Sequence, residues 1–119
     1  MLLANREEKI FWTKHSKAKM RQYRFSEKRV LGILRRPDRR EVGIAPKTIA
    51  AMQASGTKKH PGEVWMMYSY MNKASEGHKS RILSIISAWR YPGRTPLGQH
   101  PIIPEDTLEE LEFIKHSKI

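Results

Sequence analysis

Cysteine is absent from this chain of 119 residues. Disulfide bonds, thiolate nucleophiles and zinc sites with cysteine ligands are therefore excluded, and a reducing compartment is expected. Long apolar runs are absent as well. The first four residues are followed at once by the polar segment Asn5–Glu8, which predicts no signal peptide, and no later run approaches the length of a membrane span. We expect a cytoplasmic protein that does not insert into a membrane.

Acidic side chains are scarce compared with basic ones. The chain has 23 Lys and Arg against 12 Asp and Glu, for a formal net charge of +11. Residues 1–40 carry +9 (13 bases, 4 acids), residues 41–100 carry +5 (8 and 3), and residues 101–119 carry −3 (2 and 5). A basic body attracts phosphate backbones by counterion release, so RNA or another nucleic acid is the expected partner. The acidic C-terminal segment either covers that basic surface or solvates a terminal helix.

The length and composition indicate one domain. A chain of 119 residues, 39% of them hydrophobic, is large enough to bury one core and too small to divide comfortably into two. We expect a single domain over residues 1–119 with its core at about residues 9–90. The oligomeric state stays open.

The first predicted elements are a short aromatic segment and a helix. Lys9–Trp12 is typical of a strand or of the lead-in to a helix. Residues 13–23 contain no Gly or Pro, and Thr13 can cap a helix there. Ala18, Met20 and Tyr23 are available to face a core.

A second helix is predicted at about residues 27–35. Ser26 offers an N-terminal cap, and Val30, Ile33 and Leu34 recur at the spacing of one helical face. Pro37 ends the element.

Four candidate strands follow, where β-branched and aromatic residues appear in short runs between turn residues. They are Arg40–Ile44, Thr48–Gln53, Glu63–Met71 and Ser80–Trp89. Thr48–Gln53 also fits a helical turn. The last two carry large apolar residues at successive positions, which predicts a central antiparallel hairpin covered on both faces, with a polar loop over residues 72–79.

The C-terminal part is a loop followed by a helix. Residues 91–104 are rich in Pro and Gly, which predicts an ordered loop or linker. A helix is expected over residues 105–116, with acids in its first turn and an apolar stripe of Leu108, Leu111 and Ile114. The predicted fold class is α+β, with two N-terminal helices packed on a three- to four-stranded antiparallel sheet and a C-terminal helix.

The first group of candidate functional residues lies on or beside the first helix. His15 and Lys19 are one helical turn apart, so an imidazole lies beside a cation, and Arg24 follows closely. Metal-independent RNA cleavage needs a base, an acid and fixed positive charge at the phosphate. The structural alternative is that His15 orients the helix and the cations form a solvated face.

A second group is the basic loop of Lys58, Lys59 and His60 before a central strand, which suits a phosphate clamp. A His next to Pro is more often a turn residue. The third group is Arg90 and Tyr91 at the exit of the last strand, since guanidinium groups beside aromatic rings grip unpaired bases. Trp89 fits a buried core position better than an RNA contact.

Stronger motifs are absent from the sequence. The five His residues show no metal-ligand spacing, so no metal site is predicted, and no phosphate loop or nucleophile elbow occurs. No cofactor is expected.

The segments Thr13–Met20, Tyr23–Val30 and Arg36–Asp38 resemble a family of small bacterial proteins with a His-Ala-x-x-x-Met, Arg-Gly-Ile-Ser and Asn-Pro pattern. The segment Ile86–Arg90 is similar to the Ile-Ser-Ala-Arg ending of BrnT-type toxins of the RelE/ParE superfamily. The resemblance implies two helices on an antiparallel sheet, metal-independent RNA cleavage and an acidic antitoxin as partner. Ser16, Tyr23 and Arg24 depart from the pattern.

From the resemblance we carry over His15 and Arg90, and we add Tyr91, Arg81 and Lys19 on chemical grounds. The leading hypothesis is a toxin-like ribonuclease in which His15 or Tyr91 transfers protons. In that hypothesis the phosphate is held by cations, which are Lys19, Arg24, Lys58, Lys59, Arg81 and Arg90. A nucleic-acid-binding module without catalysis ranks beside it, and a module that docks an acidic protein ranks third. Whether the chain is an enzyme stays open.

Overall fold

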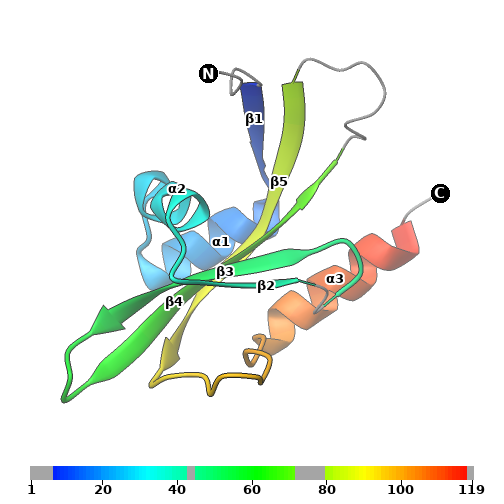
Figure 1. Cartoon of the computed structure of the whole chain (residues 1–119). Coiled ribbons are helices and arrows are strands. Elements are labelled where there is room, and N and C mark those ends of the chain that lie inside the picture. Colours follow the sequence, from blue (N-terminus) through cyan, green and yellow to red (C-terminus); the bar gives the residue numbers. More distant parts are fainter. Residues whose placement is uncertain (1–6, 43–44, 72–79, 118–119) are drawn as a thin grey trace.

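The computed structural model describes residues 7–42, 45–71 and 80–117 (Figure 1). Its elements in chain order are β1 (Glu7–Trp12), α1 (Lys14–Tyr23), α2 (Glu27–Arg35), β2 (Arg39–Val42), β3 (Ile49–Gly56), β4 (Pro61–Tyr70), β5 (Ser80–Pro92) and α3 (Glu105–Ser117). The predicted α+β class is confirmed. The candidate strand Arg40–Ile44 is seen as β2, and its residues 43–44 lie outside the described residues, as does the predicted loop 72–79.

The sheet is mixed, which corrects the predicted antiparallel sheet of three to four strands. It has five strands in the order β1-β5-β4-β3-β2. The antiparallel strands β2 to β5 follow one another in sequence, whereas β1 joins β5 in parallel, from Glu7 opposite Ser80 to Trp12 opposite Ile85. Parallel neighbours need a long connection between them. No local pattern reveals a pairing between segments so far apart in the chain.

Both N-terminal helices begin at the predicted caps. The Thr13 hydroxyl accepts a hydrogen bond from the Ser16 amide at 3.0 Å, and the Ser26 hydroxyl accepts one from the Arg29 amide at 3.0 Å. Each cap satisfies a helix donor that would otherwise lack a partner. The helices therefore start where the sequence indicates, and α2 ends before Pro37 as predicted.

Two apolar layers enclose the sheet. On the helix side, Met20 of α1 and Val30 and Ile33 of α2 pack on sheet residues that include Val64, together with Phe25 from the turn between the helices. The opposite layer, on the α3 side, is built from Trp65, Met67, Ile86 and Trp89 with Ile103 and Leu111 against it. Both faces of β4 and β5 are thus covered, as predicted. Ala18 is exposed, however, and does not join the core.

A bulge interrupts the pairing of β4 with β5. Met67 pairs with Ser87 and Tyr68 with Ile85, which leaves Ile86 as an extra residue. An extra residue changes the side to which the following side chains point. As a result, Ile85 before the bulge and Ala88 after it both belong to the helix-side core.

The C-terminal helix α3 begins at the predicted residue and ends one residue later than predicted. Its apolar stripe is only partly buried, because Leu108 is 47% exposed and Ile114 is 39% exposed. The buried side of α3 instead carries Thr107, which is fully buried, and Leu111 one turn later. The predicted loop 91–104 is also shorter, since β5 continues through Pro92. Among the helices in the described ranges, none has the length and hydropathy needed to cross a membrane.

Candidate nucleic-acid interface

Two groups of candidate residues that are separate in the sequence meet at one end of the sheet, here called the distal end. The β3–β4 turn carries Lys58, Lys59 and His60, and strand pairing places Pro92 opposite Gly62. Figure 1 shows this hairpin reaching beyond the helices at the lower left, next to the end of β5. Antiparallel pairing of β3, β4 and β5 therefore unites the basic loop with the Arg90–Tyr91 pair.

An open pocket of about 330 Å³ lies at this end. We call it the distal pocket, and its lining residues are Ser55, Gly56, His60, Gly62, Glu63, Arg90, Tyr91 and Pro92. His60 and Arg90 are exposed and Tyr91 is half-buried. These three residues line the pocket, although Arg90 and Tyr91 are neighbours on β5 and point their side chains to opposite faces of the sheet.

The turn beside the pocket depends on Gly56. Its φ is +79°, and a Cβ placed there would lie 2.2 Å from the carbonyl oxygen of His60. Any side chain at this position would both strain the backbone and clash with it. The Arg94 side chain donates to the carbonyl of Gly62 and so ties the segment after β5 to the same turn. The backbone of the pocket is therefore well held.

Arg90 lies on the helix side of the sheet. It pairs directly with Val64, a residue of the helix-side core, and directly paired residues share a face. Its Cζ lies 4.7 Å from the centre of the Phe25 ring, and its Nη2 is 3.5 Å from the carbonyl oxygen of Tyr23. Arg24, the next residue, is exposed and adopts a left-handed conformation with φ 61°. Arg24 and Arg90 therefore extend the basic surface from the pocket toward the turn between α1 and α2.

His15 and Lys19 point elsewhere, toward the start of α3. The Lys19 Nζ is 3.1 Å from both carboxylate oxygens of Asp106, and only 3% of Lys19 is exposed. The His15 Nε2 lies 3.0 Å from the Thr107 hydroxyl, which is itself 2.7 Å from the hydroxyl of Ser87. The contacts of His15 match the structural alternative, and the structure does not bring either residue into the distal pocket.

Arg81 lies at the opposite end of β5. It lies nine positions before Arg90 on the strand, a distance of about 25–30 Å. Its guanidinium group stacks over the Tyr70 ring at 4.2 Å. Arg81 and Arg90 therefore cannot hold the same phosphate.

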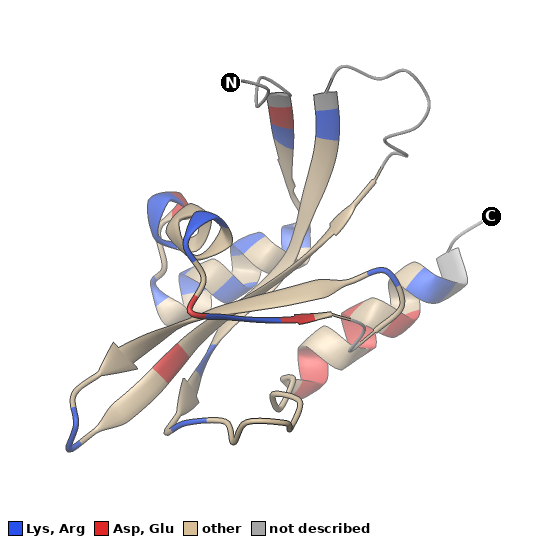
Figure 2. Cartoon of the chain, viewed as in Figure 1, with Lys and Arg blue, Asp and Glu red and all other residues tan. Residues whose placement is uncertain are grey.

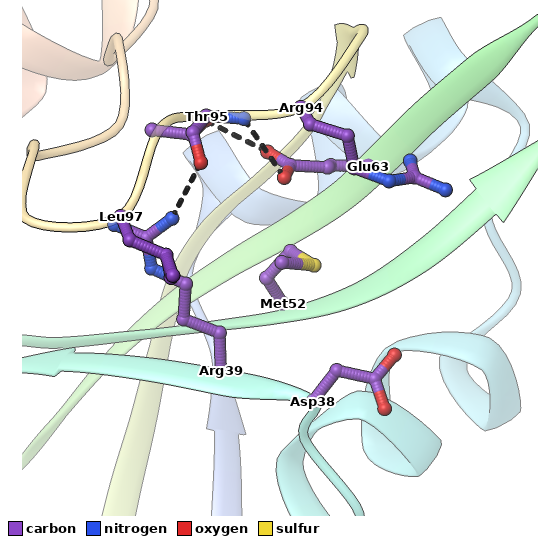
Figure 3. A pocket seen from close by; sticks show the side chains of 7 residues that line it. All are labelled: Asp38, Arg39, Met52, Glu63, Arg94, Thr95 and Leu97. Atoms are coloured by element: carbon purple, nitrogen blue, oxygen red, sulfur yellow. Dashed lines mark hydrogen bonds between the residues drawn. The ribbon is translucent and has the colours of Figure 1, made fainter.

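A buried carboxylate beneath the distal pocket was missed in the sequence. Glu63 is 1% exposed, and its Oε1 accepts hydrogen bonds from Trp65 Nε1 and the Thr95 hydroxyl, both at 2.8 Å. Its Oε2 accepts from the Thr95 amide at 3.0 Å (Figure 3). The sequence did offer one signal for this buried carboxylate, which is a charged residue at the start of an otherwise apolar strand.

Arg39 fastens the same loop. It donates to the carbonyls of Thr95 at 2.8 Å and Gln99 at 2.5 Å, and it pairs with Glu41 at 2.6 Å. A pocket of about 320 Å³ lies beside these groups. Figure 3 shows the residues that line it, which are Asp38, Arg39, Met52, Glu63, Arg94, Thr95 and Leu97. The Arg39 and Glu63 side chains at this pocket already bond to Thr95 in the segment after β5. These bonds hold that segment against the sheet. Within the described ranges, no three His, Asp or Glu side chains are grouped to hold a metal ion.

The charges separate in space as they do along the chain. In Figure 2, Lys and Arg gather on α1, α2 and the β3–β4 turn, whereas Asp and Glu gather on α3. The apolar residues of α3 pack on the face opposite α2, and the acidic helix engages Lys19 through Asp106. None of the residues of α3 whose side chains the structure describes lines the distal pocket. The helix therefore withdraws Lys19 from the basic surface and leaves the distal end open.

Comparison with protein-family models, curated proteins and solved structures finds no match for this chain.

Proposed function

We propose that this chain binds single-stranded RNA through a distal surface made of Arg24, Lys58, Lys59, His60, Arg90 and Tyr91. The supporting observation is that strand pairing gathers the basic turn and the Arg90–Tyr91 pair around one open pocket. Flexible Lys side chains on a turn attract phosphates by releasing counterions. An arginine beside aromatic rings can take an unpaired base by stacking.

Single-stranded RNA suits this surface better than a duplex. The pocket is shallow and open, and its groups are an imidazole, a phenol and a guanidinium plane, which offer flat faces to splayed bases. Reading base edges in a DNA major groove needs a protruding helix or a two-stranded ribbon with side chains that reach the bases. The β3–β4 hairpin is such a ribbon, but its tip carries two flexible lysines, which fit a phosphate backbone.

The test is binding of a fluorescent single-stranded oligonucleotide over a salt series. Removal of two phosphate contacts should make the slope of log K against log salt shallower by about 1.4, because each contact on a single strand contributes about 0.7. We therefore expect this change in the double variant Lys58→Ala/Lys59→Ala and weaker binding in Arg90→Ala. Lys115→Ala, an exposed residue of α3, is the control. Absence of binding at low salt would refute the proposal and would direct the search to an acidic protein partner.

Ribonuclease activity is a second candidate, favoured by the gathering of His60, Arg90 and Tyr91 around the distal pocket. In this reaction a base takes the proton of a ribose 2′-hydroxyl, whose oxygen attacks the adjacent phosphorus. The bond from phosphorus to the 5′-oxygen breaks, and an acid protonates that oxygen, leaving a cyclic 2′,3′-phosphate and a 5′-hydroxyl. His60 and Tyr91 are the groups for proton transfer, and Lys58 and Lys59 on the adjoining turn supply positive charge for the phosphate, because the Arg90 side chain points to the opposite face of the sheet from Tyr91.

Incubation of the protein with single-stranded RNA in EDTA separates the two candidates. Cleavage with 5′-hydroxyl ends that is lost in His60→Ala or Tyr91→Phe but kept in His15→Ala would support catalysis at the distal pocket. Loss in His15→Ala alone would instead favour the role that the sequence predicted for His15. Binding without cleavage would leave the binding module. The resemblance to BrnT-type toxins and the antitoxin partner that it implies stay predictions.

A further inference from the structure

Two arginines of β5 are held in the same way at opposite ends of the strand. Arg90 stacks over Phe25 at 4.7 Å, and Arg81 stacks over Tyr70 at 4.2 Å. An arginine that rests on an aromatic ring has a fixed plane, with N–H groups left at its edge. Such a plane can stack on a base or donate to a phosphate without first losing much conformational freedom.

The bulge places both arginines on the same face. In a regular strand, side chains that are nine positions apart point to opposite faces. The extra residue Ile86 reverses the alternation between them. Arg90 pairs with Val64 of the helix-side core, and Arg81 stacks on Tyr70, which packs against that same core. Both guanidinium groups therefore lie on the helix side of the sheet.

The surroundings of Arg81 resemble those of Arg90 in composition. The Tyr68 ring meets the Tyr70 ring edge to face at 6.0 Å, and the positive charges of Arg40 and Arg81 act on the Tyr68 hydroxyl. Arg40 is exposed, and Arg81 and Tyr70 are half-buried. We call Arg40, Tyr70 and Arg81 the proximal surface, which lies over the buried Tyr68. Glu8 of β1 pairs with Arg81 across the strands.

We propose that the proximal surface is a second contact for the RNA strand bound at the distal surface, with Arg81 and Tyr70 receiving a base or phosphate several nucleotides away. This inference rests on the proposed RNA binding and extends it to a two-point track. Exposed cations of α2 and its C-terminal cap lie on a helix that packs on the same face of the sheet, and they are Lys28, Arg35 and Arg36. These cations add positive charge to the helix side of the molecule, on which both arginines lie.

The separation sets the length of RNA that can use both contacts. Arg81 and Arg90 are about 25–30 Å apart along the strand, which corresponds to about eight or nine stacked nucleotides at 3.4 Å each. A strand of about four nucleotides therefore reaches one surface only. A strand of about twelve reaches both.

The experiment measures the affinity of the full chain for oligouridylates of about 4 and about 12 nucleotides by fluorescence anisotropy. Arg81→Ala should weaken binding of the long oligonucleotide at least about fivefold and change that of the short one less than about twofold, since one stacking contact is lost. Arg81→Lys keeps the charge but loses the plane, and should weaken the long oligonucleotide at least about twofold. Lys115→Ala is the control for the loss of one positive charge, and circular dichroism checks the fold of each variant.

The outcomes separate this inference from the proposed function. Unchanged binding of the long oligonucleotide in both Arg81 variants, with weaker binding in Arg90→Ala, would overturn the two-point track and leave RNA binding at the distal surface. An equal loss for both lengths in Arg81→Ala would also overturn the track. If Arg90→Ala and the Lys58/Lys59 double variant bind as wild type does, the proposed distal surface fails instead.

Discussion

The distal end and the contact between α1 and α3 use the same residue types in opposite ways. Both contain a histidine and a lysine. At the distal end, Lys58, Lys59 and His60 stand in solvent around an open pocket. Between α1 and α3, Lys19 is buried against Asp106 and His15 lies against Thr107.

The difference teaches that a positive charge in the sequence is not yet a charge available to a ligand. The run of cations in α1 suggests a binding face, but the lysine that points toward α3 is neutralised within the fold. A turn that extends beyond the helices keeps its charge free. The following predictions test this contrast, from the largest expected effect to the smallest.

The largest effect is expected for Asp106→Ala. This change leaves the buried Lys19 ammonium without its carboxylate and should lower the free energy of unfolding by about 1–3 kcal/mol, a value reduced because Asp106 itself is 50% exposed. RNA affinity should stay within about twofold, because the distal surface is untouched. Urea denaturation and oligonucleotide binding measure the two quantities. Glu105→Ala in the same first turn is the matched control, and an equal loss there would show that general helix charge, rather than the Lys19 pair, is responsible.

Arg90→Lys should weaken RNA binding and leave stability nearly unchanged, which is the opposite of the effect expected for Asp106→Ala. It preserves the charge but removes the planar group stacked over Phe25, so RNA affinity should fall roughly two- to fivefold while stability changes by less than about 1 kcal/mol. Anisotropy titration and thermal unfolding check both. A large loss of stability with unchanged affinity would mean that Arg90 is a packing residue, and the contrast between the two regions would then break.

Lys19→Met should be nearly neutral. Methionine fills a similar volume, and the partner Asp106 can return to water, so the free energy of unfolding should change by less than about 1 kcal/mol. Binding of RNA should not change either. Weaker RNA binding measured in this variant would show that Lys19 serves the ligand, as the sequence alone suggested.

The smallest effect concerns Tyr68 at high pH. Burial raises the pKa of the Tyr68 hydroxyl above its usual 10.0, while Arg40 and Arg81 oppose that shift. The folded state therefore keeps this proton where the unfolded chain has lost it, so the associated stability is complete below about pH 10 and declines as the pH rises through the raised pKa. Urea denaturation of wild type and Tyr68→Phe at about pH 9 and about pH 11 should show a smaller decline in the variant. An equal decline would contradict the raised pKa.

Much of the fold was predictable because its signals are local. Thr13 and Ser26 cap helices through hydrogen bonds three residues away, and Pro37 limits α2 through its own ring. The apolar runs of β4 and β5 indicate burial on both faces whatever their partners are. The prediction of the apolar stripe of α3 was less accurate. The helix faces the sheet with Thr107, which is buried against Ser87, while Leu108 stays largely exposed.

The sequence by itself determined the basic character of the chain, the helix boundaries, the central hairpin and the residue types available for binding. The tertiary structure decided which of those residues act together. The pairing of β1 with β5, the bulge at Ile86 that turns Arg81 and Arg90 to one face, and the contact of Asp106 with Lys19 all join segments that are remote in the chain or depend on strand register. Such choices follow from the packing of the whole core, because local propensity is the same whichever distant segment becomes the partner.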